Sequence, residues 1–126
     1  MDMLNHINDI IIAPHFNLSE FACPCCQKVM LHPKLLEKLE KLREIIEKPI
    51  HITSGYRCFS YNRKVGGVAN SYHLIGLAAD IKVTEINLIK LLGYAEEIGF
   101  AGIGFYEKKH FLHLDVRPTS RTRWRE

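Results

Sequence analysis

Two stretches of the chain repeat aliphatic residues with the 3.6-residue period of a helix that covers a core on one side. Leucines and isoleucines recur between charged residues after Pro33, which predicts an amphipathic helix over residues 33–47 that ends before Pro49. A second stretch of this kind, residues 86–98, ends at Gly99, a common helix terminator. The chain therefore contains two helices that each need an apolar partner surface.

Shorter stretches have the composition or the two-residue alternation of β-strands. We expect strands over residues 50–53, 78–83, 102–107 and 110–117. The segment 54–71 is rich in Gly, Ser, Asn and Tyr and predicts a long loop, which in a small domain is usually functional. Together these elements predict an α+β fold: a small, mainly antiparallel sheet with helices packed on one face, in a single domain over residues 1–126.

The last predicted strand separates apolar from ionisable side chains. Because side chains alternate between the faces of a strand, Leu112 and Leu114 share one face, and His113 and Asp115 share the other. The aliphatic face suits a core against the helices. The His/Asp face is then expected to look into a cleft.

A second polar pair, His73 and Asp80, lies among small residues that allow close packing of the backbone. An aspartate at the start of a buried strand is costly without a partner, which can be a helix cap, a salt bridge or a metal ion. A single histidine is usually a structural residue. Two imidazoles and one carboxylate, with water at the fourth position, are nevertheless a common catalytic zinc set, and His113 supplies the second imidazole.

Several short motifs follow one another along most of the chain. They are Phe16-x-Leu18-x-Glu20-Phe21-x-Cys23, Thr53-Ser54-Gly55-Tyr56-Arg57, Asn62, Val65-Gly66-Gly67, Ser71-x-His73-x-x-Gly76-x-Ala78-Ala79-Asp80, His113-Leu114-Asp115-Val116-Arg117 and Arg123-Trp124. Over about residues 16–124 this pattern closely resembles the zinc D-alanyl-D-alanine carboxypeptidase family. It is most similar to the branch found in phage lysins and small bacterial cell-wall peptidases.

The resemblance implies a zinc-dependent peptidase, with one zinc ion per chain held by His73, Asp80 and His113. It also implies that Arg57 binds a carboxylate or carbonyl of the substrate and that Ser71 contributes a hydrogen bond to the substrate. A guanidinium suits the first task because it is a permanent, fork-shaped charge. For Ser71, capping of the local turn is the simpler alternative.

The general base is the point at which the sequence departs from the family. Some members carry a Glu three residues before the last ligand, where this chain has His110. Others carry a His two residues before it, where this chain has Phe111. His110 can act as a base near neutral pH. Asp115 is the other candidate, although it can instead orient a ligand imidazole.

Four cysteines, at positions 23, 25, 26 and 58, have no assigned part in this chemistry. The first three contain one C-x-x-C, and a structural zinc site would need a second pair, of which only Cys58 is present. Buried, reduced thiols are our expectation. A disulfide to Cys58 and a second metal site remain the alternatives.

The net charge of +3 resides in residues 117–126, which contain four arginines and one glutamate. We expect a solvated basic tail that could contact an anionic polymer. Residues 1–12 do not have the pattern of a secretory signal, so we expect a cytoplasmic protein released to the wall as lysins are. We expect peptidoglycan stem peptides as substrate, no membrane span, no nucleic acid and a monomer. A non-catalytic, hedgehog-like binding module is the alternative function.

Overall fold

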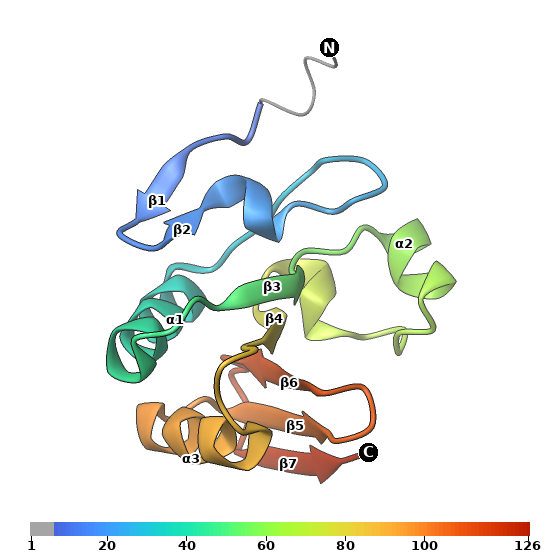
Figure 1. Ribbon diagram of the computed structural model, residues 1–126. Coiled ribbons are helices and arrows are strands. Elements are labelled where there is room, and N and C mark those ends of the chain that lie inside the picture. Colours follow the sequence, from blue (N-terminus) through green and yellow to red (C-terminus); the bar gives the residue numbers. More distant parts are fainter. Residues whose placement is uncertain (1–6) are drawn as a thin grey trace.

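A five-stranded sheet forms the centre of the computed structural model, which describes residues 7–126 (Figure 1). Its strands are β3 (His51–Ser54), β4 (Ala78–Lys82), β5 (Gly102–Tyr106), β6 (Phe111–Asp115) and β7 (Thr122–Arg125). The order across the sheet is β3-β4-β6-β5-β7. All neighbours are antiparallel except β5 and β7, which are parallel. The expected mainly antiparallel sheet is therefore confirmed.

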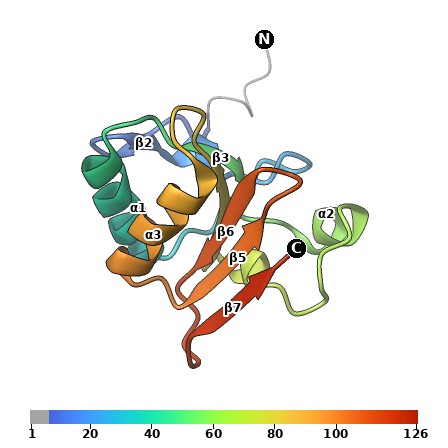
Figure 2. The same ribbon diagram turned by 60° about the horizontal axis from the view of Figure 1, so that its bottom comes forward.

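Two helices cover one face of this sheet, as the sequence predicts. They are α1 (Pro33–Ile46) and α3 (Leu88–Ile98), and they lie together on the same side of β5 and β6 in Figure 2. Helix α3 begins after the capping side chain of Asn87 and ends at Gly99, whose φ of 91° is the left-handed conformation that glycine tolerates. The core between helices and sheet includes the fully buried Leu39, Leu42, Ile81, Leu91, Leu112 and Leu114.

Smaller elements surround the other edge and face of the sheet. A two-stranded ribbon of β1 (Ile11–Ala13) and β2 (Phe16–Asn17) leads into the 3₁₀ helix η2 (Leu18–Phe21). The segment predicted as a long loop, 54–71, contains the short helix α2 (Phe59–Lys64), so that prediction is wrong in part. The 3₁₀ helix η3 (Tyr72–Ile75) follows and places His73 beside the sheet.

The basic C-terminal segment is not the solvated tail that its charge suggests. Residues 122–125 form strand β7, which pairs with β5 along the edge of the sheet. Its arginines are paired as well: Arg121 and Arg123 contact Glu96, and Arg125 contacts Glu107. The interpretation of this segment as a free cationic tail is therefore wrong. The four-residue strand was missed because its alternating basic residues look like a solvated terminus.

The register of the sheet aligns one row of residues that matters for the site. The successive Cα partners in this row, from β3 to β7, are Ser54, Asp80, His113, Gly104 and Trp124. All therefore point to the face that the two long helices leave uncovered. The glycine in this row makes room for its neighbour, since a Cβ at position 104 would lie 2.5 Å from Cε2 of Trp124.

This close approach predicts opposite effects for two glycine-to-alanine changes. We expect Gly104→Ala to lower the free energy of unfolding by about 1–3 kcal/mol, because the added methyl displaces the indole. Gly93→Ala is the matched control. Gly93 lies in α3 with open space around its Cβ position, so alanine should raise stability by about 0.5–1 kcal/mol. Urea unfolding measures both values, and equal effects at the two positions would contradict the proposed packing of Trp124.

Candidate metal centre

Three ionisable side chains meet on the uncovered face of the sheet. His73 comes from η3, Asp80 from β4 and His113 from β6, and each is less than a tenth exposed. Nε2 of His73 lies 3.2 Å from Oδ1 of Asp80, and Nδ1 of His113 lies 3.1 Å from the same oxygen. The structure thus brings together the three residues that the sequence selects as metal ligands.

The hydrogen bonds behind the imidazoles fix which nitrogen faces the centre. Nδ1 of His73 is 2.8 Å from the carbonyl oxygen of Gly55, which can only accept, so the proton resides on Nδ1. Nε2 of His113 is 2.7 Å from Oδ2 of Asp115, which likewise accepts. In their neutral forms the two rings therefore direct lone pairs, from Nε2 of His73 and Nδ1 of His113, toward Asp80.

These lone pairs make a divalent cation a fitting partner. Without one, both buried rings must carry an extra proton to hydrogen-bond the carboxylate of Asp80, or direct lone pairs at its oxygen. The three ligand atoms lie within 4.8 Å of one another, which allows one ion to contact all of them. A His₂Asp set with an open fourth position is typical of catalytic zinc. The site therefore belongs to the class of metal centres found in metal-dependent hydrolases.

The electrostatics of the site are consistent with cation binding. Burial alone would raise the pKa of Asp80, but in the metal-free site hydrogen bonds from protonated His113 and His73 outweigh it and hold the pKa well below its usual range. For His113, burial lowers the pKa, and the nearby carboxylates of Asp115 and Asp80 reverse this and raise it. A metal ion bound here would replace a proton on His113, so metal affinity should depend on pH.

Asp115 lies behind His113 rather than in the cavity. It is fully buried and accepts hydrogen bonds from the Arg117 guanidinium at 2.8 and 2.9 Å and from the Arg117 backbone at 3.1 Å. A Cβ at position 102 would lie 2.1 Å from Oδ2 of Asp115, so the carboxylate occupies space that Gly102 leaves open. This arrangement suits the orienting role considered for Asp115 from the sequence.

The role of Asp115 predicts a change in metal affinity. We expect Asp115→Asn to weaken zinc binding by about 10- to 100-fold, because the ring of His113 loses its charged hydrogen-bond partner. Competition with a chromogenic chelator measures the affinity. His110→Ala is the control and should leave the affinity unchanged. Equal zinc affinity in wild type and Asp115→Asn would remove Asp115 from the support of the site.

His110 lies apart from the three ligands. It occupies the turn between β5 and β6, is exposed, and has a left-handed φ of 62°. Its Nδ1 is 3.5 Å from the carbonyl oxygen of Glu107, and the residue is absent from the cavity wall described below. His110 as general base therefore stays a prediction to which this geometry adds no support.

Arg57 and Ser71 do lie at the cavity, but both also serve the site itself. The guanidinium of Arg57 donates to Ser54, Asn62 and Asp80 at 2.9, 3.2 and 3.1 Å. Oγ of Ser71 accepts the backbone N–H of His73 at 3.2 Å and so caps η3. Arg57 thus binds the carboxylate oxygen of Asp80 that does not face the histidines.

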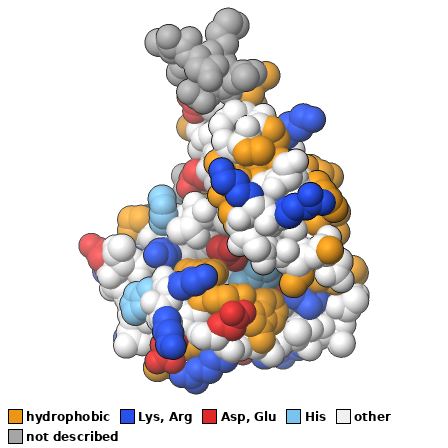
Figure 3. Space-filling model, turned by 90° about the vertical axis from the view of Figure 1, so that its right-hand side faces the viewer, with side chains coloured by type: hydrophobic (Ala, Val, Ile, Leu, Met, Phe, Trp, Pro, Cys, Tyr) orange, Lys and Arg blue, Asp and Glu red, His pale blue; other side chains and the backbone are white. Residues whose placement is uncertain are grey.

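An open cavity of about 550 Å³ lies over the three ligands. Figure 3 shows the side of the molecule that carries α2, where basic, acidic and histidine side chains lie beside hydrophobic ones. The residues around the cavity that the sequence interpretation did not assign include Tyr72, Tyr106, Lys109, Arg117, Trp124 and Glu126. A substrate segment can therefore reach the centre from solvent.

Trp124 forms one wall of this cavity. Its ring centroid lies 4.9 Å from that of His113, and the guanidinium of Arg117 lies between its ring and that of Tyr72, at 5.4 and 4.6 Å from the two centroids. Nε1 of Trp124 donates to the hydroxyl of Tyr106 at 2.9 Å. Burial raises the pKa of Tyr106 above its usual value. The Arg123-Trp124 motif was the available sequence signal.

Comparison with known proteins agrees with this class of site. A profile described as peptidase M15 matches residues 14–115, and the chain belongs to this family. It is 33% identical over 96 residues to a Haemophilus influenzae protein named "Probable peptidoglycan L,D-endopeptidase MepK". It is 30% identical over 95 residues to the Escherichia coli protein named peptidoglycan L,D-endopeptidase MepK. Each alignment covers 70% of this chain and 52% of the relative, so the chain spans about half the length of these relatives.

A third relative is similar over a shorter region. The chain is 36% identical over 67 residues to the zinc D-Ala-D-Ala carboxypeptidase of Streptomyces albus G. This alignment covers 52% of this chain and 26% of that protein.

Among residues 7–126, no helix is long and apolar enough to cross a membrane. The signal-sequence interpretation concerns residues 1–12, of which 1–6 lie outside the described part.

Proposed function

We propose that this chain is a zinc-dependent peptidase that hydrolyses peptide bonds in the stem peptides of bacterial peptidoglycan. The observation that carries the proposal is the convergence of three lone-pair donors, from His73, Asp80 and His113, at an open cavity in a member of the peptidase M15 family. Zinc bound there would lower the pKa of a coordinated water and polarise the scissile carbonyl. The proposed stoichiometry at this centre is one ion.

The protein's own groups hold the reacting partners in place. The carboxylate of Asp115 keeps the proton of His113 on Nε2, so Nδ1 remains free for the metal. Arg57 neutralises the outer oxygen of Asp80 and lies in the cavity wall, where it can also meet a substrate carboxylate. Trp124 covers the ring of His113 and limits access of water from that side. Ser71 is proposed to contact substrate from the rim while it caps η3.

Arg57 provides a test of substrate binding. We expect Arg57→Ala to lower kcat/KM on wall peptides by about 10- to 150-fold, the equivalent of about 1.5–3 kcal/mol for a hydrogen bond to a charged group. Arg63→Ala is the matched control, because Arg63 is an exposed cation of α2 that does not line the cavity. Equal losses in both variants would mean that overall charge, and not the position of Arg57, matters.

We propose that the scissile bond joins an L- to a D-amino acid, since the relatives matched over the longer region carry the name L,D-endopeptidase. Purified peptidoglycan incubated with zinc-loaded protein would be examined by mass spectrometry of the soluble products. Fragments cut between an L- and a D-residue support the endopeptidase. Free D-alanine would instead indicate the carboxypeptidase. Absence of hydrolysis by a folded, zinc-loaded protein would favour the hedgehog-like binding module.

A role as a phage lysin is a further part of the proposal, and it rests on the resemblance to that branch of the family. The pairing of Arg121, Arg123 and Arg125 with carboxylates removes the free tail as an argument for wall binding. Purified protein should clear bacteria whose membranes have been permeabilised. Hydrolysis of small soluble muropeptides without any clearing would exclude the lysin role and leave the peptidase proposal intact.

A further inference from the structure

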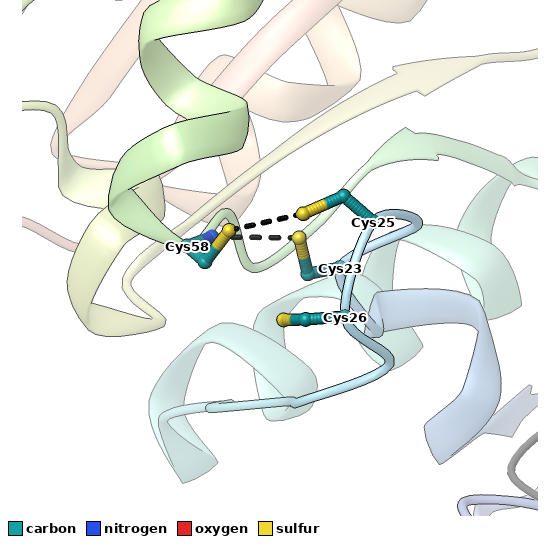
Figure 4. A group of neighbouring side chains, drawn as sticks. All are labelled: Cys23, Cys25, Cys26 and Cys58. Atoms are coloured by element: carbon teal, nitrogen blue, oxygen red, sulfur yellow. Dashed lines mark hydrogen bonds between the residues drawn. The ribbon is translucent and has the colours of Figure 1, made fainter.

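Four sulfur atoms from two distant parts of the chain meet beside the loop that carries Arg57, residues 55–58. Cys23, Cys25 and Cys26 follow η2, and Cys58 caps the N-terminus of α2. Their Sγ atoms all lie within 4.8 Å of one another. Figure 4 shows that the side chains from the two segments face a common space. The expectation of buried thiols holds only for Cys23, because Cys25 is exposed and the other two are half-buried.

The backbone around the first three cysteines forms a tight turn that presents their side chains. The N–H of Cys23 donates to the carbonyl of Lys28, and the N–H of Gln27 donates to the carbonyl of Cys23, both at 2.8 Å. Gln27 has a left-handed φ of 64°, a conformation that non-glycine residues adopt only where the surroundings impose it. The turn lets the adjacent Cys25 and Cys26 both face the cluster.

The spacing of the sulfurs matches a tetrahedral metal site. Zn–S bonds of about 2.3 Å give a tetrahedron with S–S edges of about 3.8 Å. All four Sγ atoms lie within 4.8 Å of one another, and the two of Cys25 and Cys58 are 3.3 Å apart, so one ion could contact all four. A disulfide needs about 2.05 Å between two sulfurs, and one bridge would leave the other two cysteines of the cluster without a role.

Backbone N–H groups point at two of the sulfurs, as expected for thiolates. Sγ of Cys23 accepts from the N–H of Cys58 at 3.5 Å, and Sγ of Cys58 accepts from the N–H of Tyr61 at 3.4 Å. Such bonds favour the charged form of a thiol, and thiolate is the form that binds metal. Four soft thiolates in a tetrahedron are the ligand set of zinc or of iron–sulfur centres.

We infer that Cys23, Cys25, Cys26 and Cys58 form a second metal site, a closed tetrathiolate site for one zinc ion. All four positions are filled by protein sulfur, so no position is left for water or substrate and the ion is structural. The expected zinc content rises from one to two ions per chain. The second site does not depend on the peptidase proposal, because its four ligands form a group separate from His73, Asp80 and His113.

The position of the second site indicates a structural role beside the first one. Cys58 directly follows Arg57, and the same loop carries the Gly55 carbonyl that fixes the proton of His73. The loop already rests on the segment of Cys23, because the N–H of Tyr56 donates to the carbonyl of Phe21 at 2.8 Å. An ion shared by Cys23 and Cys58 would lock these two segments together. It would thereby hold the cavity side chain and the orienting carbonyl in register.

Metal analysis of the His73→Ala/His113→Ala variant of the full chain tests the inference, because this variant lacks two ligands of the first site. After loading with Zn²⁺, native mass spectrometry should find one ion, and the four thiols should react with a chromogenic disulfide only after chelation. Loaded with Co²⁺, the variant should show thiolate-to-cobalt charge-transfer absorption. Adding Cys23→Ser and Cys26→Ser to the histidine variant should abolish both the bound zinc ion and the cobalt absorption.

Two results would overturn the second site, and neither requires the cysteine variant to fold. One is a zinc-loaded histidine variant that holds no ion and whose four thiols react as fast as after chelation. The other is a denatured, unreduced protein with two fewer thiols than the four of the sequence, which would establish a disulfide. Peptidase activity that persisted in the histidine variant with one ion retained would count against the proposed function only, and the second site would stand.

Discussion

Replacing His73 and His113 together by alanine is expected to reduce hydrolysis of wall peptides to the rate measured without protein. The change removes both imidazole lone pairs and leaves Asp80 as the one remaining donor of the centre. A single carboxylate beside the guanidinium of Arg57 has its charge already matched and is a poor ligand for zinc. Chromatography of peptides released from purified peptidoglycan measures the effect.

The matched control for this variant is His51→Ala. His51 is an exposed histidine of the same sheet, on edge strand β3, outside the cavity. It should leave hydrolysis unchanged, and circular dichroism should show that both variants are folded. Hydrolysis that persisted in the folded double variant would mean that the reaction does not use this centre.

Deleting residues 118–126 is expected to destroy activity by damaging the fold, and not by weakening adhesion to the wall. The deletion removes β7 and with it Trp124, which packs on His113 and hydrogen-bonds Tyr106. Loss of a fully buried aromatic costs about 3–5 kcal/mol. Trp124 is half-buried, so its loss costs less than this, but the edge of β5 loses its hydrogen-bonded partner as well. Urea unfolding and zinc affinity measure the damage.

Arg121→Gln/Arg125→Gln separates charge from structure. Both side chains are about two-thirds exposed, at 67% and 69%, and their ion pairs are worth little at the surface. This variant should fold and hydrolyse peptides as the wild type does. Should it instead lose wall binding at low salt while keeping its stability, the arginines would have the adhesive role first considered for them.

The elements with a strong local pattern could be predicted from the sequence. The residues of β6 alternate as expected: Leu112 and Leu114 are fully buried in the core, while His113 and Asp115 lie on the opposite face. The helix predicted over 33–47 is observed at Pro33–Ile46, and the one over 86–98 at Leu88–Ile98. Period and caps were sufficient because these features are local in the chain.

The features that were missed depend on contacts between distant segments. Strand β7 is a short edge strand, and its own sequence does not indicate that it pairs in parallel with β5. The partnership of Cys58 with the cysteines at 23–26 needs the loop after β3 to reach the segment after η2. Arg57 was expected to bind substrate, and its bond to Asp80 follows from the sheet register that sets Ser54 opposite Asp80.

Diffraction from crystals of the zinc-loaded protein, recorded on both sides of the zinc absorption edge, tests whether His73, Asp80 and His113 bind zinc. We expect an anomalous peak about 2.0–2.2 Å from three atoms: Nε2 of His73, Oδ1 of Asp80 and Nδ1 of His113. The fourth position should face the cavity. A zinc-saturated crystal with no peak between these atoms, their polar groups bonded only to one another, would contradict this expectation.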